Sequence, residues 1–275
     1  MTRIALFQSN TGIDPEASAR TLVDAIEQAS GGGAEILFTP EMSGLLDRDS
    51  ARAAKNLRPQ EQDRVLAACR EAAARHRIWL HIGSLAVLAD GGKVANRGFV
   101  IDREGEVRAT YDKLHLFDVD LPTGESWRES NTYSAGKGVV LVNGTPVGKL
   151  GLTICYDLRF PGLFARLAEA GADVIAVPAA FTVPTGMAHW HVLLRARAIE
   201  AGLFVVAAAQ VGHHEDGRNT FGHSLVADPW GEILLDMGEE KGVGLADIDL
   251  KRISDVRARI PALNHRRPIP DAVSL

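Results

Sequence analysis

The sequence has 275 residues, of which 46% are hydrophobic and 24% are charged, and its formal net charge is −5. A chain of this length can bury a sizeable core, in one large α/β domain or in two small ones. The weakly acidic charge, without a basic run, argues against nucleic acid as the main partner, and no apolar run approaches the length of a membrane span.

The first half of the chain alternates between apolar strand patterns and amphipathic helix patterns. Asp14 and Pro15 are typical of a helix start, and the glycines at 31–33 are typical of its end. A turn at 102–105 then joins two strands, the second of which leads to Lys113. The predicted strands cover residues 2–9, 34–41, 78–88 and two segments within 96–117, and the predicted helices cover residues 15–30 and 59–77.

The second half repeats this order after a long polar stretch, residues 114–146, which is predicted as a loop. Gly171 and Gly202 each follow a helix pattern and predict its end. A turn at 228–231 joins two strands, as the turn at 102–105 does in the first half. The predicted strands cover residues 147–155, 172–181, 203–212, 243–250 and two segments within 223–237, and the predicted helices cover residues 162–171, 188–202 and about 250–259.

The repeated order strand, helix, strand, helix, strand, hairpin predicts a fold with two similar halves. The alternation indicates right-handed crossovers and a mostly buried central sheet. Two such halves can pack sheet to sheet with helices outside, as a four-layer α-β-β-α sandwich, and a doubly wound three-layer fold is the competing arrangement. We expect one domain over residues 1–275, with an extended C-terminal tail from about residue 261.

The N-terminus and the cysteines bear on the cellular compartment. The first apolar run, residues 4–7, is too short for a secretory signal peptide, so we expect a cytoplasmic protein. Only two cysteines occur, Cys69 and Cys155, and so low a count in a reducing compartment argues against a structural disulfide.

Three ionisable side chains follow predicted strands, at the ends where ligands bind in α/β folds. They are Glu41 in FTPEMSG, Lys113 in TYDKLHLF and Cys155 in LTICYDLRF. Each alone is more often a surface charge or a small buried hydrophobe, and Cys69, within a helix pattern, fits the second description. Sequence spacing alone does not show that the three side chains meet.

Together, however, the three groups are sufficient for acyl transfer. A thiolate attacks a carbonyl carbon, a carboxylate moves the proton, and an ammonium group with the N–H after the cysteine stabilises the oxyanion. We expect the nearby cation and the N-terminus of a following helix to lower the pKa of the Cys155 thiol.

The same three stretches resemble the Glu-Lys-Cys signature of the nitrilase superfamily of carbon–nitrogen hydrolases, and the resemblance covers nearly the whole chain. TGMAHWHVLLRARAIEAGLFVVAAAQ and FGHSLVADPWGEIL are similar to the branch of deaminated glutathione amidases and omega-amidases. The family's α-β-β-α sandwich agrees with the internal repeat. The resemblance also implies a second glutamate, Glu129 in WRESNTYSAG, which is expected to hold Lys113 and the bound water or substrate in place.

The resemblance implies a cofactor-free amidase that cleaves the amide of a small 2-oxo acid ω-amide through a thioester on Cys155. Deaminated glutathione is the first candidate substrate, and 2-oxoglutaramate or a carbamoyl amine is the alternative within the same mechanism. A non-catalytic interaction protein on the same scaffold is the alternative from another class. The family resemblance also suggests a homodimer or a larger homo-oligomer. The charge and the lack of a long apolar run lead us to expect no nucleic acid or membrane partner.

Side chains around the cysteine are candidates for substrate contact. The expected contacts are Tyr156, Arg159, Phe181 and Thr182. Arg159 could reach a substrate carboxylate, for which a planar fork is suited, or it could pair with Asp157; the sequence leaves both open. Phe181 and Trp190 could equally well pack in the core.

The histidines do not predict a metal site. His189 and His191 stand two apart on a predicted helix and therefore do not share a face. His213 and His214 adjoin acidic residues, but a solvated loop is favoured there over a weak metal site. Relatives usually carry glutamate at the position of His191. The sequence does not show how this departure changes the local pocket wall or its hydrogen bonds.

Overall fold

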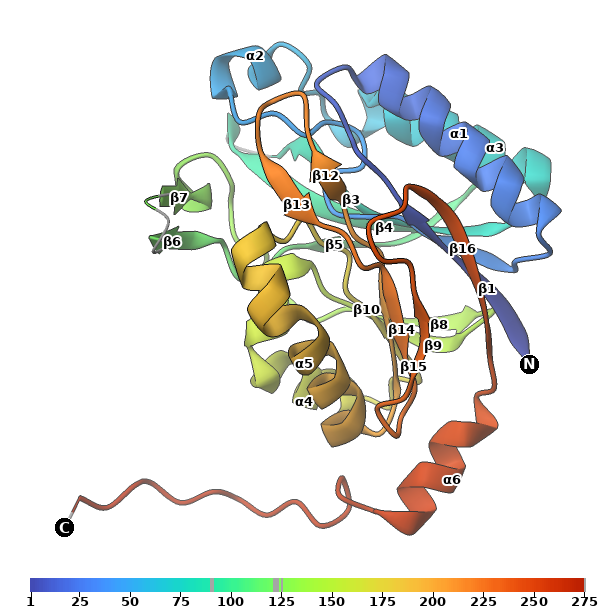
Figure 1. Ribbon diagram of the computed structural model, residues 1–275, viewed down its shortest axis with the longest axis vertical. Helices are drawn as coiled ribbons and strands as arrows, with labels where there is room; N and C mark the ends of the chain where they lie inside the picture. The colour runs from blue at the N-terminus through green and yellow to red at the C-terminus, as the bar shows by residue number, and fades with distance from the viewer. Residues whose placement is uncertain (90–91, 121–123, 125, 275) are drawn as a thin grey trace.

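Two six-stranded β-sheets form the centre of the fold in the computed structural model, which describes residues 1–89, 92–120, 124 and 126–274 (Figure 1). The first sheet has the order β16 (Gly242–Ile248), β1 (Thr2–Gln8), β2 (Ile36–Phe38), β3 (Trp79–Leu88), β4 (Val94–Ile101) and β5 (Val107–Asp112). The second has the order β15 (Ile233–Asp236), β14 (Leu225–Ala227), β11 (Phe204–Ala207), β10 (Val174–Ala176), β9 (Gly148–Leu152) and β8 (Leu141–Thr145).

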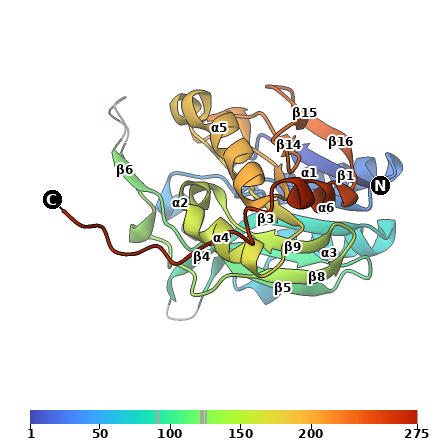
Figure 2. The same cartoon turned by 90° about the horizontal axis from the view of Figure 1, so that it is seen from below.

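Helices cover the outer faces of the two sheets, so the layers are α-β-β-α (Figures 1 and 2). Helices α1 (Pro15–Gly31) and α3 (Arg64–His76) pack together against the first sheet, and α4 (Pro161–Glu169) and α5 (Val183–Ala201) pack against the second. This confirms the four-layer sandwich and excludes the three-layer alternative, which has one central sheet.

The alternation of side chains along β1 shows how one strand serves two layers. Ile4 and Leu6 belong to a core that also contains residues of the second sheet, such as Leu150. Ala5 and Phe7 point to the other face and pack in a core with Leu22 of α1. A strand buried on both faces must be apolar throughout, which explains the continuous run in the sequence.

The internal repeat is visible in the strand pairing. In the first half, β1, β2 and β3 are parallel and β4 and β5 follow antiparallel; in the second, β9, β10 and β11 are parallel and β14 and β15 follow antiparallel. The two hairpin turns match in detail. Asp102 accepts hydrogen bonds from the backbone N–H groups two and four residues further on (3.0 and 2.9 Å), and Asp228 does the same (2.9 and 2.8 Å).

The predicted loop at 114–146 is wrong in part, because it contains three short strands. Strand β6 (Asp118–Asp120) pairs with β7 (Ser126–Arg128), the 3₁₀ turn η3 (Glu129–Asn131) follows, and β8 lies further on. Residues 121–123 and 125 of this stretch lie outside the described residues. Short edge pairs of polar residues lack the apolar run on which a strand prediction depends.

Other elements differ from the prediction in length or were not predicted. Strand β2 has three residues where eight were predicted, and α5 begins five residues earlier than predicted, with a proline in its first turn. The elements that were not predicted are α2 (Ser50–Ala54) and β13 (Asn219–Phe221). The helix predicted over 59–77 is divided into η1 (Gln60–Gln62) and α3, and β12 (Val211–His213) begins within the strand predicted over 203–212.

The C-terminal part of the chain leaves the sandwich. Helix α6 (Lys251–Arg259) is followed by residues without helix or strand, which extend away from the body of the molecule in both views (Figures 1 and 2). Arg266 contacts α4 through the carbonyl of Ala165 and the carboxylate of Glu169. No helix among the described residues is both long and apolar enough to cross a bilayer.

Candidate active site

Cys155 lies on a sharp corner, separated from strand β9 by Thr153 and Ile154. Its backbone has a φ of 50°, a left-handed conformation that is uncommon outside glycine, and its N–H donates to the carbonyl of Pro178 at 2.8 Å. The corner continues as a five-residue 3₁₀ turn, η4 (Cys155–Arg159), and the predicted α-helix begins only at Pro161. The chain therefore turns abruptly at the thiol, which is 8% exposed.

Asp157 fixes this corner from inside the protein. Its fully buried carboxylate accepts hydrogen bonds from the N–H of Ile154 (2.9 Å), the hydroxyl of Tyr111 (2.7 Å) and the N–H of His115 (3.0 Å). The His115 ring Nδ1 lies 2.6 Å from the same carboxylate. Arg159 instead lies over the ring of Phe181, 5.5 Å from its centroid, so the Asp157–Arg159 pair considered from the sequence is not formed.

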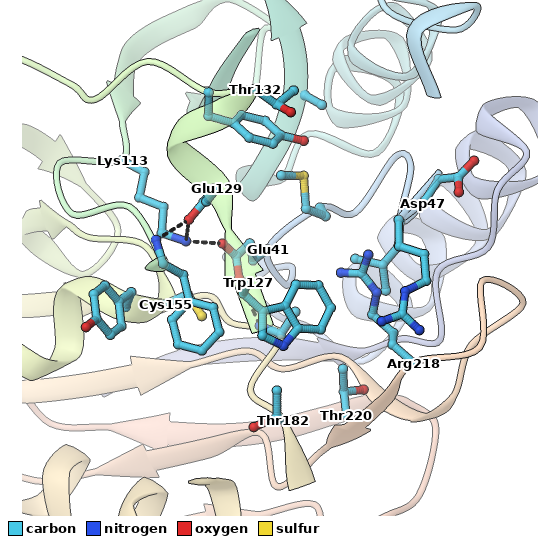
Figure 3. Close-up of a pocket in the computed structure, with 18 of the residues that line it drawn as sticks. Glu41, Asp47, Lys113, Trp127, Glu129, Thr132, Cys155, Thr182, Arg218 and Thr220 are labelled. Carbon is cyan, nitrogen blue, oxygen red and sulfur yellow. Dashed lines mark hydrogen bonds and ion pairs between the residues drawn. The ribbon is translucent and has the colours of Figure 1, made fainter. Parts of the chain in front are cut away.

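Lys113, directly after β5, lies between two carboxylates. Its Nζ donates to Glu41 at 2.8 Å and to Glu129 at 2.9 Å, and the lysine side chain is only 2% exposed (Figure 3). Burial works to lower the pKa of Lys113, but the charges of Glu129, Glu41 and the thiolate form of Cys155 outweigh it and raise this pKa well above its usual value. Lys113 is therefore a permanent cation in the site.

Asn96 is a site residue that sequence reasoning missed. Its Nδ2 on strand β4 donates to Glu41 at 2.9 Å and to Glu129 at 3.1 Å, so it joins the two carboxylates that also bind Lys113. Its Oδ1 is buried without a hydrogen-bond partner among the described residues. A buried unpaired acceptor beside a reaction centre is unusual in a folded protein. Nothing in the flanking sequence, VANRGF, marks this asparagine.

The pKa shifts of Glu41 and Cys155 place the resting proton on sulfur. Burial works to raise the pKa of Glu41, but the charge of Lys113 and hydrogen bonds from Cys155, Lys113 and Asn96 lower it on balance. Burial and the negative charge of Glu41 raise the pKa of Cys155 well above its usual value, although Lys113 opposes this. The expected lowering of the thiol pKa is therefore wrong. Proton transfer from the thiol to Glu41 would have to accompany nucleophilic attack.

These groups lie in a cavity of about 320 Å³ whose lining includes every residue expected from the sequence to contact substrate. Those lining residues are Tyr156, Arg159, Phe181 and Thr182. Phe181 also packs on Trp190, with ring centroids 4.8 Å apart, so it both lines the cavity and contacts a core side chain. Trp190 is 1% exposed and is not part of the lining, which leaves it as core packing.

The cavity also has a cationic side that was not predicted. The guanidinium groups of Arg48 and Arg218 lie over the ring of Trp127, 5.4 and 5.1 Å from its centroid, and all three residues line the cavity. Figure 3 shows Arg218 on the opposite side of the cavity from Cys155 and Lys113. Arg48 and Arg218 are far apart in the sequence and belong to no motif, so only the fold shows that they meet.

The histidines near residue 214 do not form a common site. His213 bonds to Asn219, whereas His214 is fully buried and bonds to the carbonyl of Thr11 (2.9 Å) and the hydroxyl of Thr220 (2.7 Å). The expectation of a solvated loop is therefore wrong for His214. His189 and His191 separate as predicted, because His189 lies by Arg159 (3.3 Å) and His191 contacts Asp236.

Comparison with known proteins identifies the family. The family model described as carbon-nitrogen hydrolase matches residues 3–258. The deaminated glutathione amidase of Yersinia enterocolitica is 37% identical over 273 residues, which cover 98% of this chain and 94% of that one. The deaminated glutathione amidase of Synechocystis is 40% identical over 257 residues, which cover 90% of each chain.

Solved structures agree with these sequence matches. The C. elegans NitFhit protein has a TM-score of 0.89 and 37% identity, covering 97% of this chain and 65% of that longer chain. An amidase from Nesterenkonia has a TM-score of 0.78 and 28% identity, covering 94% and 95% of the two chains. The chain belongs to the carbon–nitrogen hydrolase family of the nitrilase superfamily, and it is a cysteine-dependent amidase.

Proposed function

We propose that this amidase cleaves the ω-amide bond of a small 2-oxo acid, with deaminated glutathione as its substrate. The proposal is carried by one arrangement: a thiol hydrogen-bonded to Glu41, beside a buried lysine, in a cavity with guanidinium groups on two sides. The relatives named deaminated glutathione amidase, at 37–40% identity over most of the chain, support the choice of substrate.

In the proposed reaction, Glu41 takes the proton of Cys155 as sulfur attacks the amide carbon. Lys113 and the backbone N–H of Tyr156 stabilise the oxyanion. Glu41 then returns the proton to the leaving nitrogen, and the amine departs from a thioester. Water activated by Glu41 hydrolyses that thioester and restores the thiol. Glu129 and Asn96 hold Lys113 and Glu41 in position throughout.

The two cationic regions suggest how the substrate is oriented. Deaminated glutathione has a carboxylate at each end, one beside the 2-oxo group and one on the terminal glycine. We assign the 2-oxo acid end to Arg159, four residues from the nucleophile, and the glycine end to Arg48 and Arg218 across the cavity. Guanidinium groups are suited to this task because their planar donors match a carboxylate.

The proposal is tested by comparing the release of ammonia or amine from three substrates: deaminated glutathione, 2-oxoglutaramate and a carbamoyl amine. Deaminated glutathione should exceed 2-oxoglutaramate in kcat/KM by about tenfold or more, because a hydrogen bond to a charged group contributes about 1.5–3 kcal/mol. Arg218→Gln should lose that preference, and a variant of the exposed, distant Arg75 should keep it. Equal rates on both substrates would favour an omega-amidase, and preference for a carbamoyl amine would overturn the 2-oxo acid assignment. No release from any of the three would show that the amidase acts on another class of amide, and would overturn the proposed substrate.

The remaining properties proposed for the chain concern its organisation. We propose one cofactor-free domain over residues 1–275, with the tail from about residue 261 outside the sandwich. We also propose a homodimer or larger homo-oligomer in the cytoplasm. Size-exclusion chromatography with light scattering of the full chain tests the oligomeric state.

A further inference from the structure

Two histidines and an aspartate outside the catalytic cavity face one another beside helix α5. His191 Nε2 lies 2.9 Å from one oxygen of Asp236, and His223 Nδ1 lies 2.9 Å from the other. The ligand atoms of all three lie within 4.8 Å of one another. No other group of three such side chains is found within the described part of the chain.

Three separate elements hold these side chains in place. His191 comes from α5, His223 from the link between β13 and β14, and Asp236 from the end of β15. The backbone of His223 has a φ of 55°; its N–H donates to Gly238 at 2.7 Å, and its carbonyl accepts from Trp190 Nε1 at 2.8 Å. A histidine fixed in this uncommon conformation is positioned before any ligand binds.

We propose that His191, His223 and Asp236 bind a divalent transition-metal ion of the Zn²⁺ type. Two imidazole nitrogens and one carboxylate form a common three-residue ligand set for Zn²⁺, with water completing the coordination. Imidazole nitrogen favours Zn²⁺, Ni²⁺ or Cu²⁺, whereas Ca²⁺ and Mg²⁺ require a site built of oxygen ligands.

The side chains must rotate to accept an ion, because the two histidines contact different oxygens of Asp236 and the ligand atoms lie up to 4.8 Å apart. Tetrahedral bonds of about 2.0–2.1 Å place neighbouring ligand atoms about 3.3 Å apart. Both histidine-to-aspartate pairs, at 2.9 Å, are already close to that spacing. The three side chains are 23–32% exposed, so they can rotate and water can reach the ion.

This inference replaces the expectation from sequence that the chain has no metal site. Residues two apart on a helix do not share a face, and this rule correctly excludes His189 as a partner of His191. The actual partners, His223 and Asp236, lie 32 and 45 residues further along the chain. A bound ion would connect α5 to the β14–β15 hairpin. It would stabilise the folded chain because it binds the folded state in preference to the unfolded state.

Equilibrium dialysis of the metal-free full chain against Zn²⁺, with bound metal counted per chain, tests the proposal. We expect one ion per chain, and a fall in affinity of at least about tenfold in both His191→Gln and Asp236→Asn, since even an outer partner of a metal ligand contributes about 10–100-fold. His189→Gln is the matched control on the same helix and should bind as wild type does. Zn²⁺ should also raise the Tm of wild type more than that of His191→Gln.

The absorption spectrum of the Co²⁺-loaded chain separates this site from the catalytic thiol. A cobalt spectrum without a thiolate charge-transfer band, unchanged in Cys155→Ala, is the expected result. The proposal is overturned if wild type binds no ion, if His191→Gln and Asp236→Asn both bind as wild type does, or if Cys155→Ala alone removes binding.

Discussion

The open ends of two equivalent hairpins show how differently the two halves of the molecule are used. In the first half, the residue after β5 is Lys113, whose backbone N–H donates to Asn96 of β4 at 3.0 Å. In the second half, the residue after β15 is Met237, whose N–H donates to Ser224 beside β14, also at 3.0 Å. Lys113 therefore corresponds to Met237, and Asn96 corresponds to Ser224.

Burial separates the chemistry of these two hairpin ends. The first end faces Cys155 of the second half and encloses a lysine between two carboxylates, away from water. At the second end, Ser224 is fully buried and Met237 packs against the core, while the neighbouring Asp236 is partly exposed and contacts two half-buried histidines. The repeated backbone determines where a side chain is presented, whereas residue type and burial determine what the side chain can do.

The largest expected effect is on Cys155, whose sulfur is the nucleophile and lies in the second half of the chain. Cys155→Ala should abolish turnover and leave the fold intact, because water cannot replace the thiol at a comparable rate. Cys69→Ala should cost little activity, since Cys69 is buried in α3 and burial raises its pKa to about 12. Steady-state kinetics and circular dichroism measure both variants, and equal losses of activity would contradict the assignment.

Lys113→Met gives the first hairpin end the residue found at the second. Loss of one preorganised oxyanion donor lowers turnover by about 10²–10³-fold. The loss should appear in kcat and not in KM, because the oxyanion forms only during the reaction. An active Lys113→Met enzyme with only a raised KM would instead make Lys113 a ligand for a substrate carboxylate.

Alkylation by iodoacetamide compares the two thiols without substrate. Cys155 should react much faster than Cys69, because Glu41 can accept its proton during attack. Glu41→Gln should slow the alkylation of Cys155 by about 10²-fold, the lower end of a general base's contribution. Peptide mapping over time measures both rates, and an unchanged rate in Glu41→Gln would separate Glu41 from the thiol proton.

The smallest effect is expected at His191, which contacts Asp236 beside the second hairpin end. In metal-free solution, His191→Gln should leave kcat/KM nearly unchanged, because His191 does not line the catalytic cavity. Its free energy of unfolding in urea should fall by at most about 1 kcal/mol, since a partly exposed polar pair contributes little. A loss as large as that of Lys113→Met would show that the two ends are coupled.

The sequence predicted the parts of the site that follow strands. Glu41, Lys113 and Cys155 each come after a strand, and the repeat of strands and helices predicted two similar halves but left four-layer and three-layer packing open. The resemblance to the nitrilase superfamily then gave Glu129, which the structure places on Lys113.

Sequence could not predict the groups whose meaning depends on three-dimensional proximity. Asn96 looks like any polar residue in a strand, and Arg48 and Arg218 meet at Trp127 only because two distant loops converge. The pKa of Cys155 was predicted in the wrong direction because the motif shows the cation but not the burial or the adjacent Glu41 charge.

Mass spectrometry of the denatured chain, after brief mixing with deaminated glutathione, tests the central claim that Cys155 carries the acyl group with Glu41 as its base. We expect a 2-oxoglutaryl adduct on the peptide containing Cys155 in wild type and in Glu129→Gln, and little or none in Glu41→Gln. Abundant adduct in Glu41→Gln would contradict the account, because the first step would then use another base, with Glu129 the first candidate. An adduct on Cys69 in place of Cys155 would contradict it outright.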